Sequence, residues 1–350
     1  RLHDCPPLPN NSAISADLPD EDAEQDAPID TDSGTVANDA GYETDDAGTE
    51  STSLASSVED YTFENGRRYH KFHEGCYHFP NDDLKQERED MAHSIILYLC
   101  GQLHFAPIGM NPQIILDMGT GTGIWAMIMG EKYPSANILG VDLSPIQPEW
   151  VPSNVRFMID DVESPWVYLR NHFDYIHSRH MVVAVREWPR LMRRALRHLK
   201  PGGWIEMQEI HHHPHCHDGS MPPDHPVAQY WSLIRDGLAC LGVDSDSTLL
   251  LADMMRNAGF DNVTIQIFHV PIGTWPKDIM LKTVGGYWRT ILLDGAQPIA
   301  LGPLTRGLKW SREQVEVRLV EVRKAYINDW VHSYMPLYII CGQKPGGMGK

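Results

Sequence analysis

Residues 114–125 read Ile-Ile-Leu-Asp-Met-Gly-Thr-Gly-Thr-Gly-Ile-Trp, and this stretch decides the fold. Its apolar start predicts a buried parallel strand, after which the chain reaches Asp117. Gly119, Gly121 and Gly123 follow at every second position, where the missing Cβ lets the backbone turn sharply and approach a ligand. Residues 124–133 predict a helix, so strand, glycine loop and helix form the opening of a Rossmann-type unit.

The spacing of the glycines restricts the ligand. A dinucleotide fingerprint requires G-x-G-x-x-G, but Ile124 occupies the sixth position counted from Gly119. No Lys-Ser/Thr pair follows the loop, which argues against a phosphate-binding P-loop. The pattern Asp-x-Gly-x-Gly-x-Gly resembles motif I of class I S-adenosylmethionine (SAM) methyltransferases, in which the glycines would approach the amino-acid end of SAM. A glycine turn in another α/β protein is the alternative.

Acidic residues follow the next predicted strands. Residues 137–141 lead to Asp142, which is placed to accept hydrogen bonds from ribose hydroxyls. Residues 155–159 lead to Asp160 and Asp161, where a carboxylate can take the adenine amine and the N–H of Val162 a ring nitrogen. Strands at 173–179 and 204–208 complete an α/β, doubly wound, mostly parallel sheet whose ligands bind at the carboxyl ends of the strands.

Two flanking regions are expected to cover this sheet. The aromatic-rich residues 61–80 and a helix from Asn81 or Asp82 to about residue 103 form either a lid or an ordinary N-terminal arm. On that helix we expect one apolar face, made of Leu84, Met91, Ile95, Tyr98 and Leu99. Residues 263–269 and 334–342 resemble the antiparallel hairpin of class I methyltransferases. Between them lies a helical insertion at about 270–332, which either shapes an acceptor pocket or acts as a structural cap.

Charge and cysteine placement suggest how the chain is organised. Residues 1–60 contain 16 of the 47 acidic residues and one of the 29 basic residues, which predicts a disordered acidic tail before a nearly balanced folded part. The folded part shows no broad basic face, so we expect no direct nucleic-acid binding. Basic residues at 190–200 favour a solvated helix face over an import or nucleic-acid patch. Six scattered cysteines without CxxC spacing predict reduced intracellular thiols, and we expect neither a membrane span nor a signal peptide.

Four runs together point to one family: Glu64-Asn-Gly-Arg-Arg-Tyr-His70, Pro80-Asn-Asp, residues 116–125, and Gly140-Val-Asp-Leu-Ser-Pro-Ile-Gln-Pro148. They resemble the fungal LaeA-like methyltransferases, SAM-dependent proteins tied to secondary metabolism, over roughly residues 61–341. The resemblance implies a methyltransferase domain over 113–350, SAM as cofactor, S-adenosylhomocysteine (SAH) as product, and a cytoplasmic or nuclear location. It also implies that Asp117, Gly119, Gly121, Gly123, Asp142 and Asp161 line SAM, with Tyr69 and Tyr77 as lid contacts. Leu143, Asp160 and Val162 complete the expected SAM site.

The acceptor side is less defined. The tract His211-His-His-Pro-His-Cys-His217 departs from the family pattern; it is interpreted as an acceptor-pocket wall or a surface loop rather than a metal site, so no metal is expected. His177, His180 and His211 are candidate general bases, because a hydroxyl acceptor must lose a proton and each lies near a strand end.

The main hypothesis is methyl transfer to O or N of a small secondary metabolite. The family also contains regulators that act with velvet-type protein partners on secondary-metabolite gene expression, which is the alternative. A protein or histone methyltransferase is a third interpretation, but no acid-lined groove for a basic peptide is indicated by the sequence.

Overall fold

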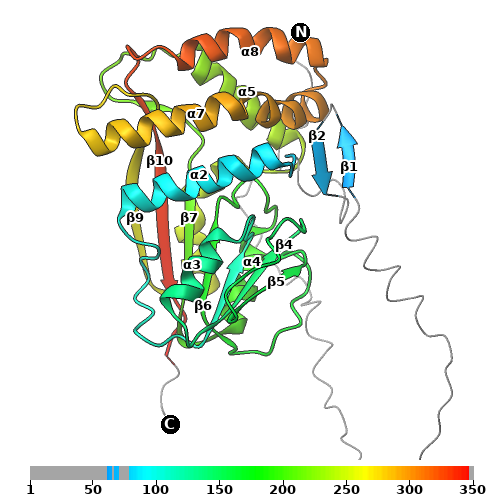
Figure 1. The fold of residues 1–350 in the computed structure, drawn as a ribbon, viewed down its shortest axis with the longest axis vertical. Helices are drawn as coiled ribbons and strands as arrows, with labels where there is room; N and C mark the ends of the chain where they lie inside the picture. Colours follow the sequence, from blue (N-terminus) through cyan, green and yellow to red (C-terminus); the bar gives the residue numbers. More distant parts are fainter. Residues whose placement is uncertain (1–60, 65–66, 71–78, 347–350) are drawn as a thin grey trace, which may run out of the picture.

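The computed structural model describes residues 61–64, 67–70 and 79–346. The predicted acidic tail at 1–60 and the predicted lid residue Tyr77 lie outside the described residues. Within the described part, the centre of the molecule is an eight-stranded sheet in the order β5-β4-β3-β6-β7-β10-β8, with β9 paired to β10 (Figure 1).

The first five strands of this sheet are parallel. They are β3 (Ile114–Met118), β4 (Asn137–Asp142), β5 (Val155–Ile159), β6 (Phe173–Arg179) and β7 (Leu199–Ile210). In register, Leu116 of β3 pairs with Leu139 of β4 and with Ile176 of β6. The chain moves outward from β3 to β5 and then returns to β6 beside β3. This reversal creates the switch point at which open α/β sheets bind ligands.

Antiparallel strands complete the sheet. β10 (Ser333–Gln343) runs between β7 and β9 (Asp261–Pro271), and Ile339 pairs with Gln208 on one side and Gln266 on the other. The short β8 (His215–Cys216) pairs with the start of β10. The predicted mostly parallel sheet with antiparallel C-terminal strands is therefore confirmed.

Alternate residues of each strand supply two separate cores, as the two-residue period of a strand requires. Ile115 belongs to the core shared with α2 (Asp83–Cys100) and α3 (Ile124–Lys132). Leu116 belongs to the core shared with α4 (Trp188–His198) and α6 (Leu251–Ala258), which cover the other face. The central strands β3 and β6 are thus buried on both sides, which explains their nearly continuous apolar sequences.

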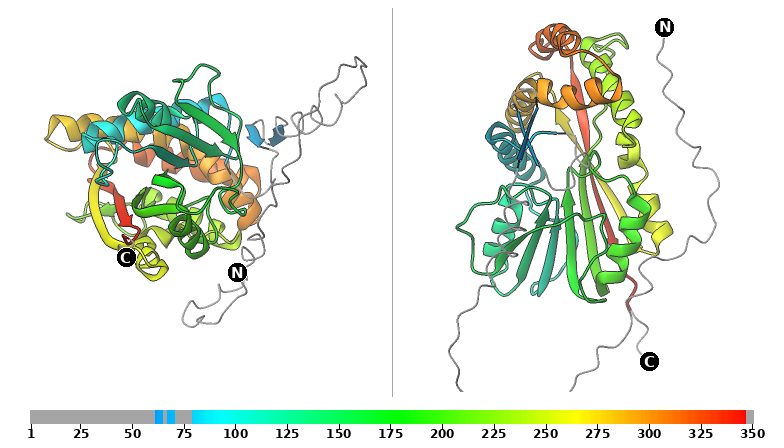
Figure 2. Two further views of the ribbon diagram at one scale, coloured as in Figure 1. Left: turned by 90° about the horizontal axis from the view of Figure 1, so that it is seen from below. Right: turned by 90° about the vertical axis from the view of Figure 1, so that its right-hand side faces the viewer.

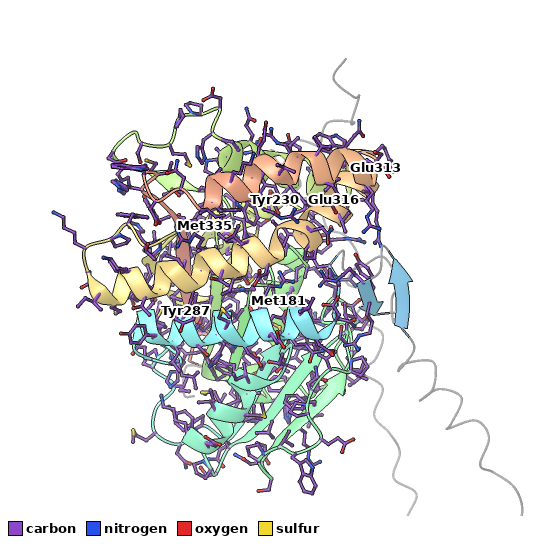
Figure 3. All side chains as sticks on the ribbon, turned by 45° about the horizontal axis from the view of Figure 1, so that its top comes forward. Met181, Tyr230, Tyr287, Glu313, Glu316 and Met335 are labelled. Atoms are coloured by element: carbon purple, nitrogen blue, oxygen red, sulfur yellow. The ribbon has the colours of Figure 1, made fainter. Side chains whose placement is uncertain are left out.

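A second layer of helices lies above the sheet. It consists of α5 (Pro226–Cys240), α7 (Ile279–Leu301), the π-helical turn η3 (Gly302–Gly307) and α8 (Arg312–Tyr326). Figure 1 and the right panel of Figure 2 show α2, α7 and α8 stacked one above another. The hydroxyl of Tyr230 (labelled in Figure 3) donates to the carbonyl of Ala296 at 2.9 Å, and Trp231 Nε1 donates to Tyr326 Oη at 2.9 Å. These bonds tie α5 to α7 and α8, so α5 and the helices of the insertion form one helical layer.

Smaller elements complete the described chain. β1 (Tyr61–Glu64) and β2 (Arg67–His70) form an antiparallel hairpin, and the 3-10 helix η2 (Ser245–Leu249) leads into α6. None of the described helices is both long enough and apolar enough to cross a membrane.

Three expectations from the sequence were wrong. Leu84 and Tyr98 are exposed, because α2 packs through the face that carries Ile95 and Ile96. Cys240 is disulfide-bonded, so the cysteines are not all free thiols. Arg194 is buried, so the basic stretch at 190–200 is not a purely solvated face.

Candidate active site

A cavity of about 240 Å³ lies where the parallel strands end. Its floor comes from the segments that follow β3, β4, β5, β6 and β7. Its roof comes from α2, α5 and α7. The cavity therefore brings together the region predicted to bind SAM and the helical layer that the sequence left without a definite role.

The glycine loop forms one wall of the cavity. Gly119 and Gly121 line it with φ values of +66° and +56°, a region that residues with a Cβ rarely adopt. A Cβ on Gly119 would overlap the sulfur of Met181, and one on Gly121 would lie 3.2 Å from Glu89 Oε2. Gly123 has a different task, because it precedes α3, packs against Phe157 and does not line the cavity.

Asp142 connects this loop to the end of β4. Its Oδ2 accepts the N–H of Gly121 at 2.9 Å, and its Oδ1 accepts the N–H of Ser144 at 2.9 Å. Burial raises the pKa of Asp142, although Lys85 and the two N–H groups act in the opposite direction. Asp142 and Leu143 both line the cavity, so the structure places them at the edge where they were predicted to act.

The segment after β5 forms a compact turn. Asp160 Oδ1 accepts the N–H of Asp161 at 2.8 Å, and Asp161 Oδ1 accepts the N–H of Glu163 at 2.8 Å. The carbonyl of Val162 accepts Arg194 Nη1 at 3.0 Å, so the buried arginine of α4 holds this turn against the sheet. Asp160, Asp161 and Val162 line the cavity together.

Asp117 occupies a different place from the one predicted. It is 2% exposed and does not line the cavity. Its Oδ1 lies 2.7 Å from His177 Nδ1, and its Oδ2 accepts the hydroxyl of Thr120 at 2.7 Å. His177 stacks on Trp125 with ring centroids 3.7 Å apart, and burial lowers its pKa even though Asp117 acts in the opposite direction. Both side chains are therefore buried behind the glycine loop, which they support, and they do not face the cavity.

Two histidines do face the cavity. His180 lies there with φ +56°, an uncommon conformation for a residue with a Cβ, and its buried Nε2 has no hydrogen-bond partner among the described residues. Burial and the neighbouring Arg179 lower its pKa to about 3. His212 also lines the cavity and stacks on Trp231, and burial and His211 lower its pKa to about 4. Both imidazoles are therefore neutral near pH 7.

His211, the third candidate base, does not line the cavity. Its Nε2 lies 3.1 Å from Asp246 Oδ1 on the other side of the segment. Adjacent residues of an extended chain point in opposite directions, so the neighbouring His212 takes the position facing the cavity. In the described part of the chain, no group of three or more His, Cys, Asp or Glu side chains is arranged to hold a metal ion.

Only the end of the aromatic-rich lead-in is seen at the cavity among the described residues, where Phe79 and Pro80 line it. Tyr69 is buried beneath the guanidinium of Arg306, which lies 5.4 Å from its ring centroid, and it does not line the cavity. Lys85, Arg88, Glu89 and Ala92 of α2 line the cavity beside Phe79 and Pro80. The sequence predicted α2 but gave no sign that its polar side chains would reach the loop, because that contact depends on tertiary packing.

The opposite part of the roof is apolar and was largely missed. It consists of Trp231, Ile234 and Leu238 from α5, and of Trp288, Ile291, Leu292, Pro298 and Ile299 from α7. In the sequence, only the tryptophan content of the insertion indicated this apolar part of the roof. The cavity thus has a polar part at the strand ends and an apolar part beneath the helical layer.

A glycine loop after β3, carboxylates after β4 and β5, and this strand order define a class I SAM-dependent methyltransferase. Residues 91–265 match the family model described as a methyltransferase domain. The chain is 41% identical over 296 residues to methyltransferase pytC of Aspergillus terreus, covering 84% of this chain and 91% of that protein. The chain belongs to the LaeA-like family of SAM-dependent methyltransferases, as two further relatives show.

The first of these is the secondary metabolism regulator LAE1 of Cochliobolus heterostrophus, 36% identical over 289 residues, which cover 81% of this chain and 94% of that protein. The second is the protein-methionine methyltransferase laeA of Emericella nidulans, 33% identical over 288 residues, which cover 81% and 76% of the two chains. The three relatives therefore each match more than four fifths of this chain.

Proposed function

We propose that this protein transfers the methyl group of SAM to an oxygen or nitrogen atom of a small, largely apolar secondary metabolite. The observation that carries the proposal is that one cavity has two chemically different parts. Glycines and carboxylates at the strand ends suit the adenosine and methionyl parts of SAM. The apolar side chains of α5 and α7 suit an acceptor that is poor in charge.

The residues on the polar side fit SAM. Gly119 and Gly121 line the cavity without a Cβ, so their backbone can come close to the methionyl part of SAM. Asp142 would accept the ribose hydroxyls, and Asp160, Asp161 and Val162 would meet the adenine. Leu143 would pack beside them. When bound, SAM supplies an activated methyl group on a sulfonium, and the protein's contribution is to orient the acceptor in line with it.

The two histidines of the cavity suit an orienting role better than proton removal. A phenol has a pKa near 10, so transfer of its proton to His180 would be uphill by roughly 9 kcal/mol. A neutral imidazole still accepts a hydrogen bond. We therefore propose that neutral His180 and His212 orient the acceptor, accepting a hydrogen bond from an amine N–H or donating one to an ionised oxygen. The acceptor atom would enter as a neutral amine or an ionised oxygen, so no histidine has to remove a proton before methyl transfer.

The test is methyl transfer from SAM with a deuterated methyl group. The full chain is incubated with a panel of small amines, phenols and carboxylic acids, and label is followed by mass spectrometry in small molecules and in the protein. Labelled small-molecule product supports the proposal. Tight SAM binding with no labelled small molecule from any class would refute it.

A second candidate is a regulatory methyltransferase that acts in a complex with velvet-type protein partners to control secondary-metabolite gene expression. One observation favours it: the thioether of Met181 (labelled in Figure 3) lines the cavity against Gly119. A methionine thioether can be methylated without a base, which suits a cavity whose histidines are neutral and weakly basic near pH 7. The Emericella nidulans relative is named as a protein-methionine methyltransferase, and LAE1 as a regulator.

The same labelled SAM separates the two candidates. The chain is incubated alone and with a purified velvet-type protein, and intact masses are measured before peptide mapping. Label on methionine of either protein, with none on small molecules, would favour the regulatory candidate. Label on small molecules alone would exclude methionine as the main acceptor.

A further inference from the structure

Asp117, the acidic residue of the glycine motif, already has hydrogen-bond partners within the protein for both carboxylate oxygens. His177 and Thr120 occupy its two oxygens, and its side chain does not reach the cavity. The methionyl end of SAM carries an α-ammonium, and a cation in a partly buried site needs an anionic or carbonyl partner. Another carboxylate must therefore face the glycine loop if the ammonium is to be neutralised.

Glu89 of α2 has an oxygen in that position. Its Oε1 lies 2.6 Å from Lys85 Nζ, one helical turn away. Its Oε2 is buried and lacks a hydrogen-bond partner, the only carboxylate oxygen in that state among the described residues. The position of a Cβ built on Gly121 lies 3.2 Å from Oε2, so this oxygen faces the open side of the loop. An unpaired buried acceptor costs free energy, which a bound donor would recover.

The helix that carries Glu89 is fixed on the loop. The hydroxyl of Thr122 donates to Asp90 Oδ1 at 2.6 Å, next to Glu89 in the sequence. At the start of α2, Asn81 Nδ2 donates to Ser144 Oγ at 3.3 Å, which joins this end of the helix to the segment after β4. Because α2 is held at both points, Glu89 is oriented before any ligand arrives.

Two other acidic side chains of the cavity accept hydrogen bonds from backbone N–H groups. Asp142 accepts two backbone N–H groups at the ribose position, and Glu163 Oε1 accepts the N–H groups of Arg186 and Glu187. We infer that Glu89 binds the α-ammonium of the methionyl part of SAM and of SAH. This inference rests on the proposed function. It assigns the glutamate of α2, rather than the motif aspartate, as the direct ionic partner of the cofactor.

Calorimetric titration tests the assignment with two ligands that differ only at this group. SAH carries the ammonium, and its deaminated analogue keeps the adenosine, thioether and carboxylate. We expect Glu89→Gln to weaken SAH binding about 10- to 100-fold, as expected for a lost bond between two charged groups. Binding of the deaminated analogue should change less than about threefold, because no ammonium is present to lose its partner.

Glu87→Gln is the matched control, since it makes the same chemical change at an exposed position of α2. It should leave both affinities as in the wild type. Retained SAH affinity in Glu89→Gln would overturn the inference, and so would an equal loss for both ligands, which would mean general damage to the site. A wild-type protein that binds neither ligand would instead refute the proposed function, and the inference with it.

Discussion

Replacing Asp142 by Asn should separate cofactor binding from folding. The carboxylate accepts Gly121 N–H and Ser144 N–H, both at 2.9 Å. Asn keeps one acceptor oxygen and turns an NH₂ group toward the other N–H, so one charge-assisted bond worth about 1.5–3 kcal/mol is lost. The substitution also removes a charge whose burial raises the pKa of Asp142, which offsets part of that loss. We therefore expect the free energy of unfolding to fall by only about 1 kcal/mol.

The effect of Asp142→Asn on SAM should be larger. The carboxylate is proposed to accept the ribose hydroxyls, and the loss of one bond to a charged group corresponds to about a 10- to 100-fold weaker Kd. Calorimetry with SAM gives the affinity, and urea unfolding of the free protein gives the stability.

Asp174→Asn is the matched control for this experiment. Asp174 Oδ2 also accepts two backbone N–H groups, those of Gln113 and Ile114, but it lies at the opposite ends of the strands. It should lose stability and keep its SAM affinity. Wild-type SAM affinity in Asp142→Asn, or an equal loss in Asp174→Asn, would refute the assignment of the ribose site.

Three further predictions concern the cavity walls. Gly119→Ala should cost about 1 kcal/mol of stability from its φ of +66° and more than tenfold in SAM affinity, and adding Met181→Ala should restore part of both in paired titrations. The pKa of His180 is lowered from 6.5 to about 3 in the folded protein. As pH falls below about 6.5, this histidine is therefore protonated in the unfolded chain but stays neutral in the folded protein, which lowers the free energy of unfolding. Between pH 7 and pH 5 this should cost roughly 2 kcal/mol of stability, and His180→Asn, which tolerates the same φ, should flatten that slope in urea unfolding. Trp288→Phe should raise the KM for the acceptor several-fold and leave the Kd for SAM unchanged; an altered Kd would place Trp288 on the cofactor side.

The part of the site that the sequence predicted well is local. Gly119, Gly121, Asp142 and Asp161 each follow a strand whose apolar run is easy to recognise, and parallel strands end at one edge of the sheet. Strand identity and this shared edge are enough to bring such residues to one cavity. Their placement therefore needs no knowledge of how distant helices pack.

Side-chain direction at those strand ends was harder to predict. Asp117 and His177 lie opposite each other on neighbouring strands, where they pair with one another and leave the cavity to residues further along. Beyond β7 the sequence offered several histidines in a row, and a one-residue difference decides whether His211 or His212 faces the cavity. Which histidine faces the cavity depends on its distance in residues from the end of β7. A strand end predicted from sequence can be wrong by more than one residue, so the sequence does not distinguish His211 from His212.

Contacts from distant segments could not be predicted at all. Glu89 reaches the glycine loop because Thr122 binds Asp90, and the apolar roof exists because Tyr230 and Trp231 join α5 to α7 and α8. No periodicity within α2 or α5 indicates a partner that lies far away in the sequence. The exposed Leu84 shows the same limit, since an apolar residue at helical spacing still lies outside the packed face.

This division has a consequence for how acceptors are selected. The glycines and carboxylates proposed to bind SAM come from residues 119–163 and one face of α2, whereas the apolar part of the cavity comes from α5 and α7. Changes in volume within α5 or α7 can therefore reshape the acceptor space without moving Asp142 or the glycine loop. The proposed histidine contacts lie between the two parts, His180 after β6 and His212 after β7, where they can meet an acceptor seated against either helix. A family with this arrangement can keep one methyl donor while its members differ in what they methylate.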